Sequence, residues 1–409
     1  MVIKLDKIFD SFIENKIFQN KSVLQINYTP DNIPHRDNEI ENVASILAPA
    51  LRGERTSNLF VYGRTGTGKT LCLQYVSNEM MRRAAEAAGN VAEGEANGVN
   101  VVYVNCKLKK VADTEYRILA ELIRVLGGKV ASTGLPTDSL YNKFVELVDQ
   151  RKQIVIIVLD EIDQAVKRIS DGFLYSLTRI NQELKRAQIS IVGVSNNLNF
   201  MDNIDPRVRS SLGEEELIFP PYNALQLQEI LRKRSAQAFS AGVLGDGVLS
   251  KCAAFAAREH GDARRALDLL RVAGEVAQRE GADKVLLAHI DKANEKIERD
   301  RILYTIENEP KQFQLVLLAI IELNMDKDYQ KVFTGDIYNK YQEICENTRN
   351  DILTQRRVSD MIAEFDMLGI INANVISKGR EGRTKEIKLM IPPNVVDKAK
   401  QILIDGIGK

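Results

Sequence analysis

The pattern G-x-x-x-x-G-K-T, at residues 63–70, constrains this chain more than any other feature. An apolar run at residues 59–62 precedes it and a helical periodicity at residues 71–81 follows it, so it lies between a predicted strand and a predicted helix. There the glycines free the backbone to wrap its N–H groups round phosphates, Lys69 reaches the outer phosphates and the Thr70 hydroxyl can bind Mg²⁺. The residues expected around a bound nucleotide are Gly63, Gly66, Thr67, Gly68, Lys69, Thr70 and Leu71. The alternative is a chance glycine turn before a helix.

A second predicted strand ends in carboxylates. The continuously apolar run at residues 154–159 is typical of a central parallel strand covered on both faces, and it is followed by Asp160, Glu161 and Asp163. Open α/β sheets bind ligands at such carboxyl ends. We expect Asp160, with Thr70, to hold Mg²⁺, and Glu161 to polarise the water that attacks the γ-phosphoryl group. The alternative is that these acids cap the next helix, a role for which Asp163 is the better candidate.

Two further polar groups are candidates for contact with the terminal phosphate. The apolar run at residues 189–194 is followed by Ser195 and Asn196, and an amide at that point could orient the attacking water; asparagine after a strand is also a common turn residue. A helix that begins near residue 261 carries Arg264 and Arg265 at its start. An arginine from a neighbouring domain could contact the γ-phosphate, and the alternative is a solvated helix face.

The bulk composition excludes several classes of protein. The 56 basic and 56 acidic side chains give a formal net charge of zero, so any nucleic-acid surface must be local. The four cysteines are scattered without C-x-x-C spacing and there are three histidines, which argues against disulfides and against a zinc or histidine-based metal site. The longest apolar runs are far too short for a membrane span or a signal peptide. We therefore expect a globular, cytoplasmic protein.

A length of 409 residues suggests two or three domains. We expect an α/β nucleotide-binding domain at residues 1–222, with residues 101–104 as another strand. Within it, an Ala-, Glu- and Gly-rich stretch at residues 82–100 predicts a helix end and a surface loop. Residues 223–305 predict a helical lid domain and a connecting helix. Its expected helices span residues 224–239, 248–259, 263–279 and 288–306.

The last part of the chain, residues 306–409, has the order of a winged helix-turn-helix domain. Predicted helices at residues 313–322, 334–346 and 354–368 are followed by predicted strands at residues 370–376 and 385–391. Apolar residues recur at helical spacing in the third helix and should face the core, with a glycine after them as the stop. These residues are Val358, Met361, Ile362, Phe365, Leu368 and the terminating Gly369.

Two parts of this domain are candidates for contact with duplex DNA. Gln355, Arg356 and Ser359 are left exposed at the start of the third helix, where a recognition helix reaches base edges in the major groove. The hairpin between the two strands combines glycines with a basic cluster that could approach a phosphate or a minor groove, although a solvated basic turn is the alternative. The basic residues of the hairpin are Lys378, Arg380, Arg383 and Lys385.

Taken together, these motifs resemble the archaeal replication initiators of the AAA+ class, a family related to the eukaryotic origin recognition complex and to the helicase-loading cell-division-control protein. The resemblance covers nearly the whole chain, and its motifs occur in the family order: the phosphate loop, the Leu-Asp-Glu strand end, Ser195-Asn196, Pro220-Pro221-Tyr222, Gly-Asp-Ala-Arg and the winged helix. It implies an α/β AAA+ P-loop domain with a helical lid, followed by a winged helix-turn-helix domain.

The resemblance also implies roles for single residues. Asn196 would be the sensor 1 residue and Arg264 the sensor 2 arginine. Residues 33–36 would lie against the adenine, so Pro34 and Arg36 join the expected nucleotide-binding residues. Tyr222, in the Pro-Pro-Tyr motif, is expected to belong to the same set. The helix at residues 113–126 matches an initiator-specific insertion that meets DNA in this family. That position makes Lys109, Lys110, Tyr116 and Arg117 candidate phosphate contacts.

The chain departs from the AAA+ pattern at one point. Many AAA+ proteins place a trans-acting arginine directly after a serine in the segment that corresponds to residues 205–211, but here Ser211 takes that place. Arg207 or Arg209 could substitute for it. An arginine finger can supply about 10³-fold or more in rate, so a chain without one should be a slow ATPase that acts as a switch.

The sequence thus predicts an initiator that binds ATP or ADP with Mg²⁺, binds duplex DNA at replication origins and helps to recruit or load the replicative helicase. Other initiator copies or paralogues on the DNA are further candidate partners, and the protein should be cytoplasmic and associated with the nucleoid. One alternative is a DNA-binding AAA+ regulator of transcription or transposition. Another is a metabolic phosphotransferase, which would leave the winged helix unexplained.

Overall fold

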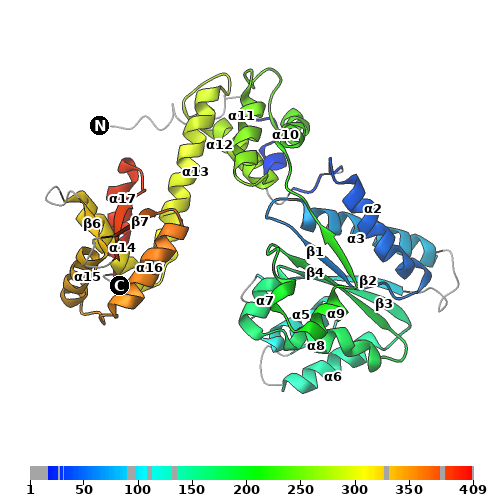
Figure 1. Ribbon diagram of the computed structural model, residues 1–409. Coiled ribbons are helices and arrows are strands. Elements are labelled where there is room, and N and C mark those ends of the chain that lie inside the picture. Colours follow the sequence, from blue (N-terminus) through cyan, green and yellow to red (C-terminus); the bar gives the residue numbers. More distant parts are fainter. Residues whose placement is uncertain are drawn as a thin grey trace. The chain divides into compact units, whose positions relative to one another are not determined.

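The computed structural model describes residues 17–25, 28–30, 32–89, 98–107, 113–130, 136–326, 331–377 and 383–407 (Figure 1). The chain folds as two compact units, Met1–Ile290 and Asp291–Lys409. The predicted domain boundary at residue 222 lies inside the first unit, between a strand and a helix. The one predicted at residue 305 falls within the long helix α13 (Leu287–Asn308).

The first unit is built on a five-stranded sheet in the order β2-β3-β4-β1-β5. All of its strand pairs are parallel. The strands are β1 (Leu59–Tyr62), β2 (Gly98–Asn105), β3 (Gln153–Asp160), β4 (Gln188–Ser195) and β5 (Glu215–Ile218). Tyr62 pairs with Ser195, and Asp160 pairs with Val194, so the carboxyl ends of β1, β3 and β4 lie at one edge of the sheet.

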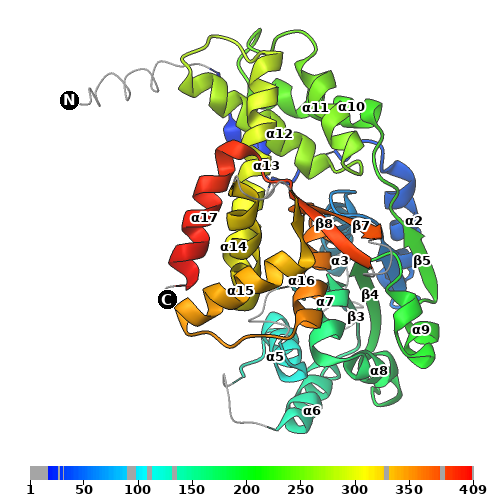
Figure 2. The ribbon, with the colours of Figure 1, turned by 60° about the vertical axis from the view of Figure 1, so that its left-hand side comes forward.

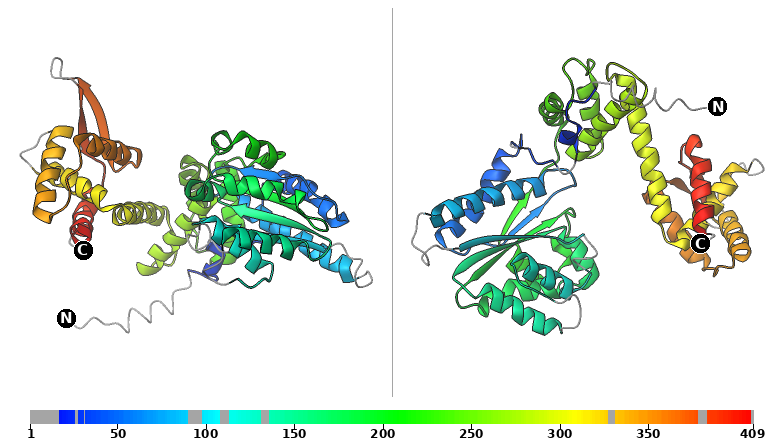
Figure 3. Two further views of the ribbon diagram at one scale, coloured as in Figure 1. Left: turned by 90° about the horizontal axis from the view of Figure 1, so that it is seen from below. Right: turned by 180° about the vertical axis from the view of Figure 1, so that it is seen from behind.

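Helices cover both faces of this sheet, which explains the continuous apolar run of β3. Ile154, Ile156 and Val158 pack into one core, and the alternate residues Val155 and Ile157 pack into the other. Figures 1 and 3 show α2 and α3 on one face of the sheet and helices α5 to α9 on the other. The first layer is α2 (Asp37–Leu47) and α3 (Lys69–Gly89); the second is α5 (Glu115–Val125), α6 (Thr137–Val148), α7 (Ile162–Ile169), α8 (Gly172–Arg179) and α9 (Pro206–Leu212).

The predicted helix end lies within residues 82–100, but the helix before it and the strand after it are both longer than expected. Helix α3 continues to Gly89, and β2 already begins at Gly98, while residues 90–97 lie outside the described residues. The helix continues because alanine, glutamate and arginine are good helix formers. Arg82 also forms ion pairs with Glu79 and Glu86, one turn away on either side.

A helical lid completes the first unit, and the N-terminal segment packs against it. Its helices are α10 (Ala224–Ala238), α11 (Val248–Arg258), α12 (Ala263–Arg279) and the start of α13, as predicted within one or two residues. Phe18 lies 4.8 Å from Phe239, measured between ring centroids, and Lys21 pairs with Glu275 on α12 at 2.7 Å. A Cβ atom at Gly274 would lie 2.4 Å from Phe18, so only glycine admits this ring against α12.

The second unit confirms three helices followed by a hairpin and adds two elements that were not predicted. Its elements are α14 (Lys311–Met325), β6 (Val332–Phe333), α15 (Thr334–Thr348), α16 (Gln355–Met367), β7 (Ile371–Ser377), β8 (Arg383–Leu389) and α17 (Pro393–Ile407). The antiparallel sheet has the order β6-β8-β7. Figure 2 shows β7 and β8 side by side near α16, and the left view of Figure 3 shows the hairpin standing out from the helices of this unit.

One predicted core residue of the second unit is exposed. Val358, Met361, Ile362 and Phe365 are buried, but Leu368 is 44% exposed. The reason is the end of the helix: Gly369 has φ +70° and turns the chain, so that Ile370, only 2% exposed, takes the next place in the core.

All four cysteines are buried and free. Burial raises the pKa of Cys72 to about 12, and of Cys252 to about 12, so these thiols are protonated and unreactive at neutral pH. Among the described residues, no helix is long and apolar enough to cross a membrane.

We expect Gly274→Ala to destabilise the first unit. A Cβ there overlaps Phe18, and overpacking of this kind costs about 1–3 kcal/mol, more than the 0.5–1 kcal/mol or so that alanine normally gains over glycine within a helix. The midpoint of thermal unfolding should fall, and protease should cut the N-terminal segment faster. Gly335→Ala in α15, where a Cβ meets nothing within 4 Å, is the control. Equal midpoints for the two variants would show that Phe18 does not pack on α12.

Candidate nucleotide-binding site

A cavity of about 790 Å³ lies at the edge of the sheet where β1, β3 and β4 end. Its described lining comes from the N-terminal segment, the glycine loop, the strand ends and the lid. The residues from the loop and the strand ends are Gly66, Thr67, Gly68, Lys69, Thr70, Leu71, Asn105, Asp160, Glu161 and Asn196. The lid contributes Arg234, Ala263, Arg264 and Leu267 among others, so the cavity has walls from both the sheet domain and the lid.

The glycine loop is in direct contact with the lid. Gly66 has φ +73°, and a Cβ there would lie 1.7 Å from the Asp262 carboxylate at the start of α12. The Ala263 N–H donates to the Gly66 carbonyl at 3.2 Å. Glycine is therefore required at residue 66 both by the backbone conformation and by the approach of the lid.

Lys69 is almost fully buried, and carbonyl oxygens surround its ammonium group. Its Nζ donates to the carbonyls of Gly63 and Arg64 at 2.7 and 2.8 Å and to Oδ1 of Asn196 at 2.9 Å. Burial is the main reason that the pKa of Lys69 is lowered to about 8, although Asp160 partly opposes it. A phosphate is a stronger partner for this cation than neutral carbonyls are, so the arrangement suits an incoming polyanion.

Thr70 and Asp160, predicted as metal ligands, lie together. The Thr70 hydroxyl donates to Oδ2 of Asp160 at 2.9 Å. A hydroxyl and a carboxylate are hard oxygen donors of the kind that Mg²⁺ prefers beside phosphates, so the pair fits this ion. The Tyr103 hydroxyl, from β2, also donates to Oδ2 of Asp160, a contact that the sequence did not predict. Burial, followed by the charge of Asp160, raises the pKa of Tyr103 well above its usual range, and the phenol stays a donor.

Glu161 occupies the sharp turn after β3. Its φ of +54° and ψ of +44° are left-handed, which is uncommon for a residue with a side chain and is often found at functional sites. Its carboxylate is 18% exposed and lies 3.6 Å from Nζ of Lys107. Asn105, paired with Asp160 across β2 and β3, lines the cavity beside it. A carboxylate in this position can polarise a water molecule in the cavity.

Of the two predicted lid arginines, Arg264 lines the cavity. Arg265 turns to Glu259, with Nε 2.9 Å from Oε2. The start of α12 is held in place by Asp262, whose Oδ1 accepts from the N–H of Arg264 at 2.7 Å and of Arg265 at 3.2 Å. Burial raises the pKa of Asp262. Gly261, at φ +70°, lets this turn pack on the backbone of Tyr222. The sequence singled out the turn but not the role of Asp262.

Arg36 has a different position from the one expected. Pro34 and Tyr222 line the cavity, but Arg36 is 2% exposed and is not among the described lining residues. Its Nε donates to the Thr67 carbonyl at 2.8 Å, and its guanidinium lies 3.9 Å from the centroid of the Tyr222 ring. Arg36 also forms an ion pair with Glu39 at 2.9 Å and donates to the Pro220 carbonyl at 2.5 Å. Arg36 therefore supports the glycine loop through the Thr67 carbonyl rather than by lining the cavity.

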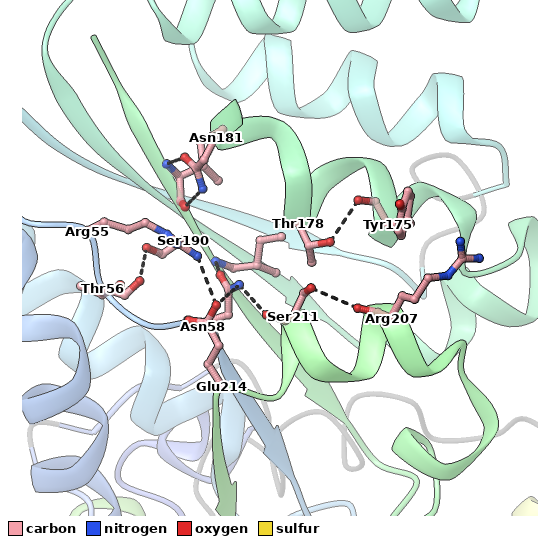
Figure 4. A network of polar contacts seen from close by, with 12 residues as sticks. Arg55, Thr56, Asn58, Tyr175, Thr178, Asn181, Ser190, Arg207, Ser211 and Glu214 are labelled. Atoms are coloured by element: carbon pink, nitrogen blue, oxygen red, sulfur yellow. Dashed lines mark hydrogen bonds and ion pairs between the residues drawn. The ribbon is translucent and has the colours of Figure 1, made fainter. Parts of the chain in front are cut away.

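The candidate arginine-finger segment is anchored to the sheet (Figure 4). Asn58, the residue before β1, accepts from the Ile191 N–H at 2.8 Å and donates to the Ser211 carbonyl at 2.7 Å. Arg207 and Arg209 are exposed and pair with Asp205 and Asp202, at 2.8 and 3.1 Å. Neither arginine is among the described residues that line the cavity of their own chain.

The predicted DNA-contacting residues occur in both units. Tyr116 packs partly into the core of the first unit, and Arg117 pairs with Asp113 at 3.0 Å. In the second unit, Gln355 and Arg356 are exposed at the start of α16, while Ser359 and Lys385 are half-buried. Lys109, Lys110, Lys378 and Arg380 lie outside the described residues, as does the side chain of Arg383.

Comparison with known domains defines the class. The AAA domain family matches residues 52–201, the Cdc6 AAA+ ATPase-type lid domain matches residues 228–295, and the CDC6 C-terminal winged helix domain matches residues 304–399. The protein is therefore an AAA+ ATPase with a Cdc6-type lid and a winged helix domain.

Full-length relatives specify the family. The chain is 50% identical to the ORC1-type DNA replication protein 1 of Methanosarcina mazei, over 98% of this chain and 94% of the relative. It is 52% identical to the ORC1-type DNA replication protein of Pyrococcus furiosus, over 95% and 91%. The Aeropyrum pernix ORC1 protein, solved in complex with DNA, is 43% identical and superimposes with a TM-score of 0.82, covering 95% of this chain and 97% of that one. The chain belongs to the archaeal Orc1/Cdc6 family of DNA replication initiators.

We expect ATP binding at about pH 9 to take up close to one proton. Most Lys69 side chains are neutral at that pH in the free protein, because their pKa is lowered to about 8. Phosphates favour the charged form, so binding raises the pKa and draws a proton from solution; near pH 7 the lysine is already charged and the uptake should vanish.

Calorimetry in two buffers that differ in ionisation enthalpy measures this uptake. Lys233→Met removes another lysine that lines the cavity and should leave the uptake unchanged, which makes it the matched control. Identical binding heats in the two buffers at the higher pH would contradict a phosphate contact by Lys69.

Proposed function

We propose that this protein is an ATP-dependent replication initiator that binds duplex DNA at origins and helps to recruit or load the replicative helicase. The observation that carries the proposal is the cavity shared by the glycine loop, the strand ends and the lid arginine Arg264. A ligand in such a cavity contacts two domains at once, and so its chemical state can set their relative position. The DNA-bound Aeropyrum pernix ORC1 relative supports extending this to DNA.

The chemistry of the cavity favours a nucleoside triphosphate with Mg²⁺. Thr70 and Asp160 would hold the metal ion, which would neutralise charge on the phosphate oxygens. Lys69 would exchange its carbonyl contacts for phosphate oxygens. Glu161 would hold the attacking water, and Asn196 would contact the water or the γ-phosphate from the end of β4.

The same geometry favours a slow ATPase that acts as a nucleotide switch. Ser211 replaces the usual finger arginine, and Arg207 and Arg209 form ion pairs within their own segment. Arg264, at the start of α12, is one of the lid cations that line the cavity. Loss of the γ-phosphate would remove its partner there, and α12 with its contact at Gly66 would be free to shift.

Two surfaces of the second unit would contact DNA. The exposed start of α16, with Gln355 and Arg356, would read base edges, because Val358 and Ile362 hold the opposite face of this helix in the core. The β7–β8 hairpin would contact phosphates or a groove through Lys385 and its basic neighbours. Tyr116 and Arg117 in the first unit remain further proposed contacts.

Genome-wide mapping of the bound DNA tests the proposed function. We expect sites at replication start points and a strong reduction in occupancy for Lys69→Ala, which loses the cation that faces the phosphates. Sites spread over many promoters would favour a transcriptional regulator instead. Occupancy that does not change in Lys69→Ala would show that DNA binding does not depend on nucleotide.

We further expect the two surfaces of the winged helix to differ in what they read. Lys385→Ala should weaken binding to every duplex and lower the salt slope of log K by about 0.9, as expected for one lost phosphate contact. Arg356→Ala should mainly reduce the preference for origin over scrambled DNA, by roughly 1–3 kcal/mol, because an arginine can pair bidentately with guanine.

Salt titrations of both variants on origin and scrambled duplexes provide the measurement. Lys398→Ala removes an exposed lysine of α17, away from α16 and the hairpin in sequence, and controls for the loss of one positive charge. If Arg356→Ala weakened both duplexes equally and Lys385→Ala alone changed base preference, the hairpin rather than α16 would read the sequence.

A further inference from the structure

Asp163 is a buried carboxylate that does not act as a helix cap. It lies in the first turn of α7 and is 5% exposed. No side-chain hydrogen bond caps α7 at Glu161, within the part of the chain that the structure describes. Instead, Oδ1 of Asp163 accepts from the Ser195 hydroxyl at 3.0 Å, and Oδ2 accepts from the Gln164 amide at 2.8 Å. A buried carboxylate is costly unless it is hydrogen-bonded, so this position is held by specific contacts.

Ser195 carries the contact from α7 to the end of β4. It is fully buried, and its Oγ also accepts from the Asn197 N–H at 3.0 Å. This hydrogen bond from residue 197 back to residue 195 closes the short turn that contains Asn196. The side chain of Asn196 points to the glycine loop, where its Oδ1 accepts from Nζ of Lys69. A change at Ser195 would thus reach Asn196 through the backbone of one short turn.

Asp163 is also close to Glu161 along the chain, two residues after it. Glu161 adopts its left-handed conformation two residues before Asp163, so the first turn of α7 determines where the Glu161 carboxylate lies. Neither Asp163 nor Ser195 is among the described residues that line the cavity, whereas both Glu161 and Asn196 are. One buried hydrogen bond thus joins the two segments that carry these residues.

We propose that Asp163 and Ser195 form a positioning pair that holds Glu161 and Asn196 at the correct separation for hydrolysis of the nucleotide. The inference rests on the nucleotide hydrolysis proposed above. The pair does not touch the phosphates. It acts on the chemical step through the two residues that face the cavity, and it contributes little to binding, which depends on the glycine loop and Lys69.

Removal of one hydroxyl tests the pair, and a matched serine lies on the same strand. Ser190 is also on β4 and fully buried, but its hydroxyl donates to the Thr56 carbonyl at 2.8 Å, towards the opposite end of the strand from Ser195 (Figure 4). We expect Ser195→Ala to lower the rate of single-turnover ATP hydrolysis by about tenfold or more and to leave the ATP dissociation constant within about threefold. Ser190→Ala should destabilise the fold to a similar degree without slowing hydrolysis. Ser195→Thr, which keeps the hydroxyl, should recover most of the rate.

A double-mutant cycle with Asp163→Ala tests the contact itself. The double variant should be no slower than the slower single variant, because either substitution already breaks the pair. Additive losses would overturn the proposal. If Asp163→Ala fails to fold, the comparison of Ser195→Ala, Ser195→Thr and Ser190→Ala decides alone: equal hydrolysis rates for the two alanine variants would refute the pair.

A second readout does not need hydrolysis. In protein labelled with ¹⁵N-asparagine, the side-chain amide signal of Asn196, assigned by its loss in Asn196→Ala, should shift in Ser195→Ala but not in Ser190→Ala. An unchanged signal in Ser195→Ala would refute positioning of Asn196. A shifted signal with an unchanged hydrolysis rate would refute the role in the chemical step. Loss of ATP binding by the wild-type protein would instead count against the proposed function.

Discussion

The parallel pairing of β4 with both β1 and β3 is the constraint on which the rest of the site depends. This register brings Tyr62, Ser195 and Asp160 to one edge of the sheet. Glu161 and Asn196, the residues that follow β3 and β4, line the cavity there together with the glycine loop that follows β1. Three separate segments supply Lys69 and Thr70, Glu161, and Asn196. These side chains come together because each follows closely on the end of its strand. The continuous burial of β3 makes this register costly to change, since a shift would expose apolar residues on both faces.

The lid is joined to this edge by short, directional contacts. Gly66 accepts the Ala263 N–H and leaves room for Asp262, and Gly261 packs on Tyr222. Arg36 links the carbonyl of Thr67 to the Tyr222 ring on the other side of the glycine loop. A phosphate that pulls on the loop or on Arg264 would therefore act directly on α12. These contacts support the nucleotide switch proposed above.

The sequence was most reliable where a function needs residues at a fixed local spacing. The glycine loop, the acidic end of β3 and the start of α12 were all predicted from short motifs. The helices of the lid followed from their apolar periodicity. Prediction was weaker where tertiary packing, rather than the local sequence pattern, decided which residue is buried or paired. Leu368 continued the periodicity of α16, but the turn at Gly369 placed Ile370 in the core instead. The short strand β6 carries too few residues for a periodic signal.

What the sequence by itself determined is the order of domains, the family and the candidate residues of the nucleotide site, because spacing along one loop or one helix turn encodes them. Only the tertiary structure decided what holds those residues in place. Arg36 binds the carbonyl of Thr67, Tyr103 binds Asp160, and Asp163 binds Ser195, each across more than 30 residues of chain. Such partners leave no periodic mark, since a buried donor and acceptor are brought together by the packing of whole elements rather than by neighbouring residues.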